Sequence, residues 1–569
     1  MRRTLIVRLR IIAAVLITVA LILVAKLYYI SVVEHDAYLA KAENQLGGAT
    51  QEMLERGDIF FTEKSGSRAA AALVQTAYNV NLNLTILKNA DTVYTALNAI
   101  TPIDSELFKR AVAKINDPHE TVAKHVSREV VEKINALKII GVSTSPERLR
   151  IYPGRTHGAH VLGFVGYKAD RRVGRAGLER YWEDKISKKN EGPNKSFFAD
   201  LLVNAVALGG GDANGQGADL ITAIEPTVEQ RLEEILASVA ETYSPKIVGG
   251  VILDPKTGAV LAMAAYPTFD PNAYGSVTDP GVFSNPMVEG LYEFGSTMKP
   301  LTMLAGIDSK AVTSTTEYTD TGVIVRDGAR VSNYDGRARG RVPMQEVLSQ
   351  SLNTGAAFVA EQMGIETFAR YFTSFGLGEE TGIDLPGEVP GLLSALQSGS
   401  ALDLASASFG QGIAVTPIAM TRALGALANH GVIVNPHVVD QFYYPSGVHH
   451  RAWQEGDRRV VSAESADTVT RMLVKVVDDA LLQGKLKMEH YSIAAKTGTA
   501  QIAVAGGGYY PDRYLHSFFG YFPAHDARFL IFLFTVEPKG VTYASQTLAE
   551  PFGELARFLI SYYDVPPDR

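Results

Sequence analysis

The stretch Gly295-Ser-Thr-Met-Lys-Pro300 is the most informative segment of this 569-residue chain. On a helix, residues three apart lie on the same face, so the amine of Lys299 can lie beside the hydroxyl of Ser296 and, when deprotonated, take its proton. Gly295 permits a tight entry into the helix, and Pro300 is tolerated only near a first turn. The spacing predicts a nucleophilic serine with its own base at a helix amino terminus. Taken alone, such a pair is more often a solvated helix face.

A second motif, Ser351-Leu-Asn353, follows an amphipathic stretch over residues 342–348. Ser and Asn two apart in a loop can both point into a cleft, where one relays a proton and the other holds an amide carbonyl. Taken alone, this pattern is a common turn.

A third motif, Lys496-Thr-Gly-Thr499, is typical of a short strand. Its lysine supplies positive charge, the hydroxyls of Thr497 and Thr499 can bind a carboxylate, and Gly498 lets a substrate backbone approach closely. An ordinary edge strand is the alternative. Three motifs in this order, on a predicted helix, loop and strand, rarely arise by chance.

The order Ser-x-x-Lys, Ser-x-Asn, Lys-Thr-Gly resembles the serine acyltransferases that react with penicillin. Further segments are similar to the class B penicillin-binding proteins, and the Tyr-Glu-x-Gly-Ser-Thr segment leans towards their division-type branch. These segments are Arg56-Gly-Asp-Ile59, Arg150-Ile-Tyr-Pro-Gly154, His160-Val-Leu-Gly-Phe-Val-Gly166, Gly174-Arg-Ala-Gly-Leu-Glu179, Val331-Ser-Asn-Tyr-Asp335, Phe409-Gly-Gln-Gly-Ile413 and Val415-Thr-Pro417.

The resemblance implies a peptidoglycan D,D-transpeptidase that cross-links stem peptides ending in D-Ala-D-Ala, is inhibited by β-lactams, and uses no cofactor or metal. It also implies a membrane glycan polymerase and other cell-wall machinery as partners. The implied roles are nucleophile for Ser296, general base for Lys299, proton relay for Ser351, peptide positioning for Asn353, and electrostatics and carboxylate binding for Lys496, Thr497, Gly498 and Thr499. The backbone N–H groups of Ser296 and Thr499 would form the oxyanion hole.

Residues 240–566 are expected to form the transpeptidase domain, an α/β (α+β) fold with one antiparallel sheet flanked by helices. Gly249 to Ala265 predicts two strands around a turn at Asp254 to Gly258. Further strands are predicted over residues 517–522 and 529–536, and a closing helix over residues 548–563.

Residues 34–225 predict an elongated, non-catalytic α+β pedestal of the dimerisation type, with a charged helical patch over residues 121–137. The glycine-rich segment 209–217 lacks the Gly-Lys-Ser/Thr ending of a phosphate loop, and we expect a turn or linker there.

The amino terminus predicts a membrane anchor. Residues 11–33 carry one charge, Lys26, and roughly 23 residues at about 1.5 Å each span a hydrocarbon core of about 30 Å. Arginines among residues 1–10 place that tail in the cytoplasm and the rest of the chain outside the cell membrane. A cleaved signal peptide is the alternative, but no small-x-small cleavage site follows.

Composition excludes several other classes of protein. The net charge of -7 and the absence of a long basic run argue against nucleic acid as a partner. The absence of cysteine excludes disulfides and thiolate chemistry. His157 and His160 could share a helical face as metal ligands, but no third ligand accompanies them, and a structural role is favoured.

The chain departs from the family pattern in two places. Phe294 stands where the family usually has proline, which could change the shape of the cleft. After Ile59, the family's Asp-Arg-Asn-Gly turn is replaced by the sequence of residues 60–66.

Two other functions remain open. A β-lactamase or D,D-carboxypeptidase uses the same motifs but passes the acyl group to water, although no Glu-x-x-x-Asn lies between Asn353 and Lys496. A membrane sensor would bind β-lactam or peptidoglycan without turnover, but the cytoplasmic tail of about ten residues is too short for a signalling domain.

Overall fold

The computed structural model describes Lys26 and residues 56–569, apart from residues 115, 116, 118, 170, 188–216, 445, 446, 448, 453–455 and 505. The predicted anchor, apart from Lys26, and most of the glycine-rich segment therefore lie outside the described residues. Among the helices that are described, none combines the length and apolarity needed to cross a membrane. The chain divides into two compact units, and the described part of the first is Gln75–Leu149 while the second is residues 56–74 and 150–569.

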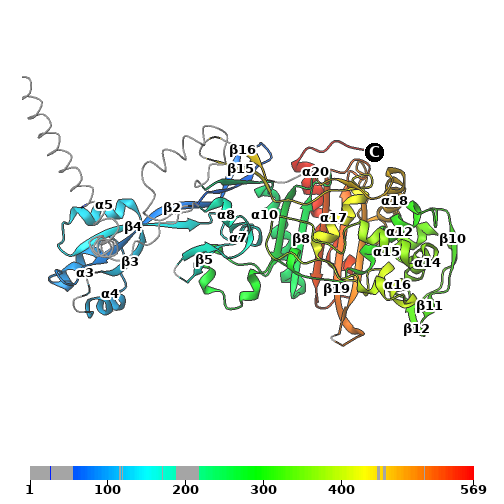
Figure 1. The fold of residues 1–569 in the computed structure, drawn as a ribbon, viewed down its shortest axis with the longest axis horizontal. Coiled ribbons are helices and arrows are strands. Elements are labelled where there is room, and N and C mark those ends of the chain that lie inside the picture. Colours follow the sequence, from blue (N-terminus) through cyan, green and yellow to red (C-terminus); the bar gives the residue numbers. More distant parts are fainter. Residues whose placement is uncertain are drawn as a thin grey trace, which may run out of the picture. The chain divides into compact units, whose positions relative to one another are not determined.

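The first unit is a small α+β body in which the helices α3, α4 and α5 pack on strands (Figure 1). Its elements are the distal part of β2 (Arg68–Leu82), α3 (Ala90–Asn98), α4 (Ser105–Val112), β3 (Glu120–Val126), α5 (Arg128–Ala136) and most of β4 (Val142–Ile151). The strands β3 and β4 both pair with β2, and a core that includes Leu82, Leu97 and Phe108 joins them to the helices.

The prediction of helix throughout residues 121–137 is wrong for its first part. Residues 120–126 form β3, in which Val122 and Val126 are buried. Pairing with β2, for example Tyr78 opposite Val126, supplies the backbone partners that a helix would otherwise provide. The later part forms α5, as predicted, and the hydroxyl of Ser127, just before the helix, caps its first turn.

The second unit contains a sheet assembled from distant parts of the chain, in the order β16-β15-β7-β1-β2. Its strands are β1 (Ile59–Thr62), β7 (Asp219–Thr222), β15 (Val439–Tyr443) and β16 (His449–Arg451), with the first part of β2. Parallel pairing joins β1 to β7, and antiparallel pairing joins β7 to β15.

A five-stranded antiparallel sheet, in the order β18-β19-β20-β8-β9, confirms the predicted fold (Figure 1). Its strands are β8 (Ile247–Leu253), β9 (Val260–Tyr266), β18 (Ala494–Ala503), β19 (Tyr509–Phe522) and β20 (Phe529–Val536). Each strand that was predicted from sequence is present. The strand of the third motif, β18, lies at the edge of the sheet.

Both faces of this sheet are buried, which explains the nearly continuous apolar runs in its strands. Phe518 and Ile531 pack on one face with α10 (Pro226–Tyr243) and the predicted closing helix, α20 (Ala549–Tyr562). Phe519 and Phe532 alternate onto the opposite face. That face is covered by helices that include α17 (Pro417–Ala428) and α18 (Ala463–Lys475), and α12 (Lys299–Asp308) packs on both of these helices. The active-site motifs lie on this helical side.

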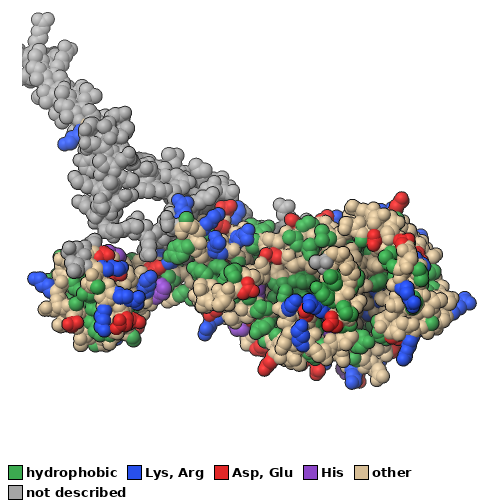
Figure 2. All heavy atoms as spheres, turned by 90° about the horizontal axis from the view of Figure 1, so that it is seen from below, with side chains coloured by type: hydrophobic (Ala, Val, Ile, Leu, Met, Phe, Trp, Pro, Cys, Tyr) green, Lys and Arg blue, Asp and Glu red, His purple; other side chains and the backbone are tan. Residues whose placement is uncertain are grey.

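The second unit also contains further helices, short helical turns and strands. They are α6 (Ala159–Leu162), β5 (Val165–Lys168), β6 (Arg171–Gly174), α7 (Gly177–Tyr181), α8 (Glu183–Ile186), η2 (Pro271–Ser276), η3 (Pro280–Phe283), α11 (Pro286–Glu289), η4 (Gly295–Met298), β10 (Glu317–Asp320), β11 (Val323–Arg326), β12 (Ala329–Ser332), β13 (Gly340–Pro343), α13 (Met344–Ser349), α14 (Asn353–Met363), α15 (Ile365–Ser374), η5 (Ser394–Gln397), α16 (Ala401–Ser408), β14 (Val432–Ile433), β17 (Arg458–Arg459), η6 (Val476–Ala480), η7 (Leu481–Gly484) and α19 (Ala544–Thr547). Figure 2 shows basic and acidic side chains interspersed over the face that it presents.

Three segments that resemble the family meet in a buried ionic cluster within the second unit. Arg56 donates to Glu179 at 2.5 Å and to Glu183 at 2.8 Å. Arg150 donates to the other oxygen of Glu179 at 2.6 Å, and the hydroxyl of Tyr152 donates to that same oxygen at 3.1 Å. Burial raises the pKa of Glu179, but the two arginines outweigh this effect and hold it below its ordinary value. Removal of either arginine would leave a buried charge partly unpaired.

Candidate active site

The three predicted motifs meet at one cleft with a volume of about 870 Å³. The predicted site residues that line it are Ser296, Ser351, Asn353, Lys496, Thr497 and Thr499. Lys299 and Gly498 are buried behind its wall. The motifs therefore come together from η4, from the turn before α14 and from β18.

Ser296 lies in the short 3-10 turn η4, which leads directly into α12. The preceding Gly295 has φ +60°, a left-handed conformation that favours glycine. A Cβ at Gly295 would lie 3.1 Å from the carbonyl oxygen of Thr499. The turn of the nucleophile thus packs closely against β18, and the predicted position of the serine at a helix amino terminus is confirmed.

Gly498 serves this close packing. A Cβ there would overlap the carbonyl oxygen of Phe294 and would lie 3.0 Å from the backbone nitrogen of Thr297. Its missing side chain therefore lets the strand approach the nucleophile turn, and the glycine faces that turn rather than the cleft.

Phe294 lies in the core instead of shaping the cleft. Its side chain is fully buried, with its ring edge-on to Phe532 at 5.0 Å between centroids. Its carbonyl oxygen accepts hydrogen bonds from the hydroxyls of Thr297 and Ser517, at 3.0 Å and 2.9 Å. Phe294, which departs from the family pattern, thus fixes the turn of the nucleophile to the core of the domain.

Lys299 is 1% exposed, and its ammonium group lies against Ser351. Its Nζ donates to the carbonyl oxygen of Ser351 at 2.6 Å and to its Oγ at 3.1 Å. Burial, and then the nearby charge of Lys496, hold the pKa of Lys299 well below its ordinary value. A lysine in this position can lose its proton at neutral pH and act as a base.

Lys496 is also buried, with 3% exposure, and its Nζ donates to the carbonyl oxygen of Thr497 at 3.1 Å. Burial lowers its pKa to about 8. At pH 7 most of its population is therefore charged and can bind an anion. The hydroxyl of Thr499 accepts a hydrogen bond from the backbone nitrogen of Ala544 at 3.0 Å, so its own proton is free to be donated into the cleft.

The second motif differs locally from the predicted loop, because Asn353 begins α14. Ser351 precedes the helix with φ +55°, which is uncommon for a residue with a side chain. The amide nitrogen of Asn353 donates to the carbonyl oxygen of Ser332 at 2.8 Å. The side chain of Ser351 is thus held by Lys299, and the side chain of Asn353 is held by Ser332.

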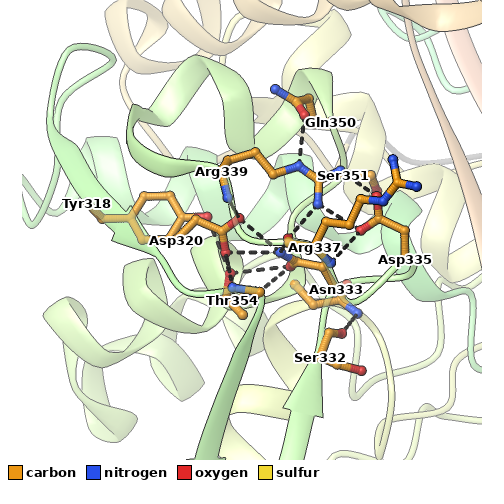
Figure 3. A network of polar contacts seen from close by, with 12 residues as sticks. Tyr318, Asp320, Ser332, Asn333, Asp335, Arg337, Arg339, Gln350, Ser351 and Thr354 are labelled. Atoms are coloured by element: carbon orange, nitrogen blue, oxygen red, sulfur yellow. Dashed lines mark hydrogen bonds and ion pairs between the residues drawn. The ribbon is translucent and has the colours of Figure 1, made fainter.

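A buried polar network supports the carboxyl-terminal side of this motif (Figure 3). Its centre is Asp320, which accepts from Thr354 Oγ1 at 2.7 Å, from Asn333 Nδ2 at 3.0 Å and from the backbone nitrogen of Arg339 at 2.9 Å. Burial raises the pKa of Asp320, but these hydrogen bonds outweigh it and hold the pKa below its ordinary value. Asp320 therefore stays charged and fixes the first turn of α14.

The same network supports the amino-terminal side of the motif. Arg339 makes two hydrogen bonds to Asp335, at 2.7 Å and 2.8 Å, and donates to Gln350 at 3.0 Å. Gln350 immediately precedes Ser351. The network therefore holds the Ser-Leu-Asn segment from both ends (Figure 3).

We expect this network to position the second motif. A substitution of Thr354 tests this role, because Thr354 belongs to the network but does not line the cleft. Thr354→Val removes the hydroxyl but keeps the shape, and should slow acylation by penicillin about tenfold as the segment loses its fixed geometry. Thr354→Ser keeps the hydroxyl and should restore most of the rate. Stopped-flow acylation rates of folded protein check this. A valine variant with a lowered melting temperature but an unchanged acylation rate would reduce the network to a stabilising role.

The predicted histidine pair has structural partners. His160 is buried edge-on to Phe269 and contacts the carbonyl oxygen of Val282 at 3.0 Å, and burial lowers its pKa to about 4. His157 forms a hydrogen bond with Glu233. Across the described ranges, no cluster of three or more His, Asp or Glu side chains could hold a metal ion.

Sequence reasoning missed several residues of this region. Asp320 carries no motif, and the only signal for Thr354 is that it follows Asn353. Arg330, Tyr334, Gln411, Tyr509 and Tyr543 also line the cleft. Tyr509 donates to Glu293 at 2.9 Å, which ties the start of β19 to the segment before the nucleophile.

Comparisons with protein families match both halves of the chain. A family model described as "Penicillin binding protein transpeptidase domain" matches residues 248–556. A second, described as "Penicillin-binding Protein dimerisation domain", matches residues 55–194.

Similar proteins cover most of the chain. Stage V sporulation protein D of Bacillus subtilis (strain 168) is 30% identical over 504 residues, which are 84% of this chain and 76% of that protein. Peptidoglycan D,D-transpeptidase FtsI of Escherichia coli (strain K12) is 25% identical over 465 residues, which are 79% of this chain and 73% of that protein. The crystal structure of penicillin binding protein 2X from Streptococcus thermophilus has a TM-score of 0.73 at 19% identity and covers 90% of this chain and 81% of its own, which shows the shared fold.

Proposed function

Since this chain belongs to the class B penicillin-binding proteins, we propose that it is a peptidoglycan D,D-transpeptidase that carries its acyl intermediate on Ser296. The observation that carries this assignment is the cleft in which the nucleophile turn, the Ser-Leu-Asn segment and the Lys-Thr-Gly strand meet. β-Lactams, which mimic the D-Ala-D-Ala end of a stem peptide, acylate the same serine.

The reaction begins when neutral Lys299 takes the proton of Ser296. The freed Oγ attacks the carbonyl carbon of the penultimate D-alanine, and the backbone N–H groups of Ser296 and Thr499 stabilise the oxyanion, each donor contributing about 10²–10³ in rate. The close approach of Gly295 to Thr499 supports this placement.

The intermediate collapses by breaking the bond to the terminal D-alanine, whose amine receives a proton through Ser351, the hydrogen-bonding partner of Lys299. An amine of a second stem peptide then attacks the acyl-serine, a base removes its proton, and Ser296 is released with its own proton restored. Asn353 positions the donor peptide, and Lys496 and the hydroxyls of Thr497 and Thr499 bind its terminal carboxylate.

The fate of the acyl group distinguishes a transpeptidase from a hydrolase. The detergent-solubilised full-length chain is incubated with a pentapeptide ending in D-Ala-D-Ala and a D-amino acid acceptor. Mass spectrometry should show the exchanged peptide as the major product. Only hydrolysed tetrapeptide would favour a carboxypeptidase, and no release of D-alanine would favour a sensor.

The pH profile of penicillin acylation should be bell-shaped. Lys299 must be neutral, so the rate falls as pH decreases through its lowered pKa. Lys496 must be charged, so the rate also falls as pH rises through about 8. Lys496→Arg should remove the alkaline limb, because arginine keeps its charge. An alkaline limb that stays near pH 8 in this variant would assign that limb to another group.

Residues 11–33 are proposed to anchor the protein in the cell membrane, with residues 1–10 in the cytoplasm and the catalytic domain outside. Arginines before the apolar stretch support this orientation. We assign residues 34–225 to the non-catalytic module and 240–566 to the transpeptidase domain. Glycan polymerisation is assigned to a separate membrane protein, since class B family members lack that activity.

A further inference from the structure

The cleft has an unusual charge balance for this chain. Within the described part of the chain, two cationic side chains, Arg330 and Lys496, and no Asp or Glu line it. The chain as a whole carries a net charge of -7, so this local excess of positive charge is not a general property of its surface. In the proposed mechanism, Lys496 binds the terminal carboxylate of the donor peptide. Arg330 has no role in that scheme.

Arg330 lies close in sequence and register to the second motif. It belongs to β12, opposite Val325 of β11. Ser332 follows two residues later on the same strand, and its carbonyl oxygen holds Asn353. Two residues of a strand span about 7 Å and their side chains share a face. Arg330 is therefore within reach of a peptide that Asn353 positions.

Two nearby arginines are neutralised, in contrast to Arg330. Arg326 makes two bonds to Glu361, at 2.5 Å and 2.9 Å. Arg339 makes two bonds to Asp335. The structure records no ion pair for Arg330 with any described residue, and its side chain is exposed in the cleft. Its guanidinium is free to bind an anion.

We propose that Arg330 binds a second carboxylate of the donor stem peptide, so that the enzyme selects donors with a free carboxylate upstream of D-Ala-D-Ala. The proposal rests on the transpeptidase function. A guanidinium forms two parallel hydrogen bonds with a carboxylate, and an amide in that place loses both the charge and one acceptor.

Two positions of a stem peptide can supply the group. One is the α-carboxylate of a second residue that is linked through its side chain, and the other is the side-chain carboxylate of a diamino dicarboxylic third residue. Amidation neutralises either of them. A set of three pentapeptides separates the sources: one with both carboxylates free, one amidated at the second residue and one amidated at the third.

The measurement is kcat/KM for D-alanine release by the full-length enzyme. We expect one of the two amidated peptides to be about five- to tenfold poorer than the free peptide. Arg330→Gln should bring this ratio close to one, and Arg330→Lys should keep part of it. Arg341→Gln is the matched control, since Arg341 lies on β13, pairs with Glu317 at 2.6 Å and does not line the cleft. Its ratio should equal that of the wild type.

Competition against penicillin acylation by the same peptides provides a second measurement if turnover is slow. A wild-type ratio near one for both amidated peptides would overturn the proposal, as would a preference that persists in Arg330→Gln. Failure of the transpeptidase function gives a different result in the exchange assay: a carboxypeptidase would release D-alanine but form only hydrolysed peptide, and a sensor would release no D-alanine from any of the three peptides.

Discussion

Replacement of Ser296 by alanine should abolish covalent labelling by penicillin. The variant lacks the hydroxyl that is assigned as the nucleophile, so the acylation rate should fall by about 10⁴-fold or more. The fold should persist, because Ser296 lies at the surface of the cleft and the turn is held by Gly295 and Phe294. Intact-mass analysis after incubation with excess penicillin measures the adduct directly.

Ser545→Ala is the matched control. Ser545 lines the same cleft and has no part in the proposed chemistry. Its adduct should form at the wild-type rate. A penicillin increment that persists in Ser296→Ala would show that another residue is the nucleophile. Rapid loss of the wild-type adduct with release of hydrolysed penicillin would indicate a β-lactamase.

The two buried lysines should respond differently to the same substitution. Lys299→Arg should lower the acylation rate by about 10²–10⁴-fold, because arginine does not deprotonate and cannot accept the serine proton. Lys496→Arg keeps the charge that faces the substrate carboxylate and should retain a measurable fraction of the rate, about a tenth. The structure supports this asymmetry, since the pKa of Lys299 is lowered by burial and also by the charge of Lys496.

Second-order acylation rates with one penicillin at pH 7 decide between the two lysines. Circular dichroism and thermal unfolding must first show that both variants are folded, because both side chains are buried. Equal losses in the two variants would contradict the assignment of Lys299 as the base. A Lys299→Arg enzyme that is the faster of the two would reverse the assignment.

The sequence predicted the central sheet well because its strands are buried on both faces. Alternating residues such as Phe518 and Phe519 pack into different cores, so the whole strand must be apolar and is visible as a run. The strand β3 gave no such signal. It carries charged residues whose pattern predicts a helix, and only its long-range pairing with β2 determines its conformation.

The motifs were predictable because each combines several residues whose chemistry depends on spacing. Asp320 and Thr354 could not be found in this way, since each acts through a contact between segments that sequence does not place together. Arg330 could not be found from the sequence either, because a single arginine forms no motif. Its proposed role depends on the absence of acidic side chains among the described residues that line the cleft.

The strand order of the second unit also restricts which segments of the gene can be exchanged between related bacteria by recombination. The strand β15 pairs with β7, and β7 pairs with β1, so the segment matched by the transpeptidase model contains β15 but neither β7 nor β1. A gene segment cut at residue 248 would carry a strand whose edge has lost its hydrogen-bonding partner and whose Phe442 has lost the edge-on ring of Trp182. Mosaic genes with functional products should therefore inherit residues 56–62, 219–222 and 439–443 from one parent.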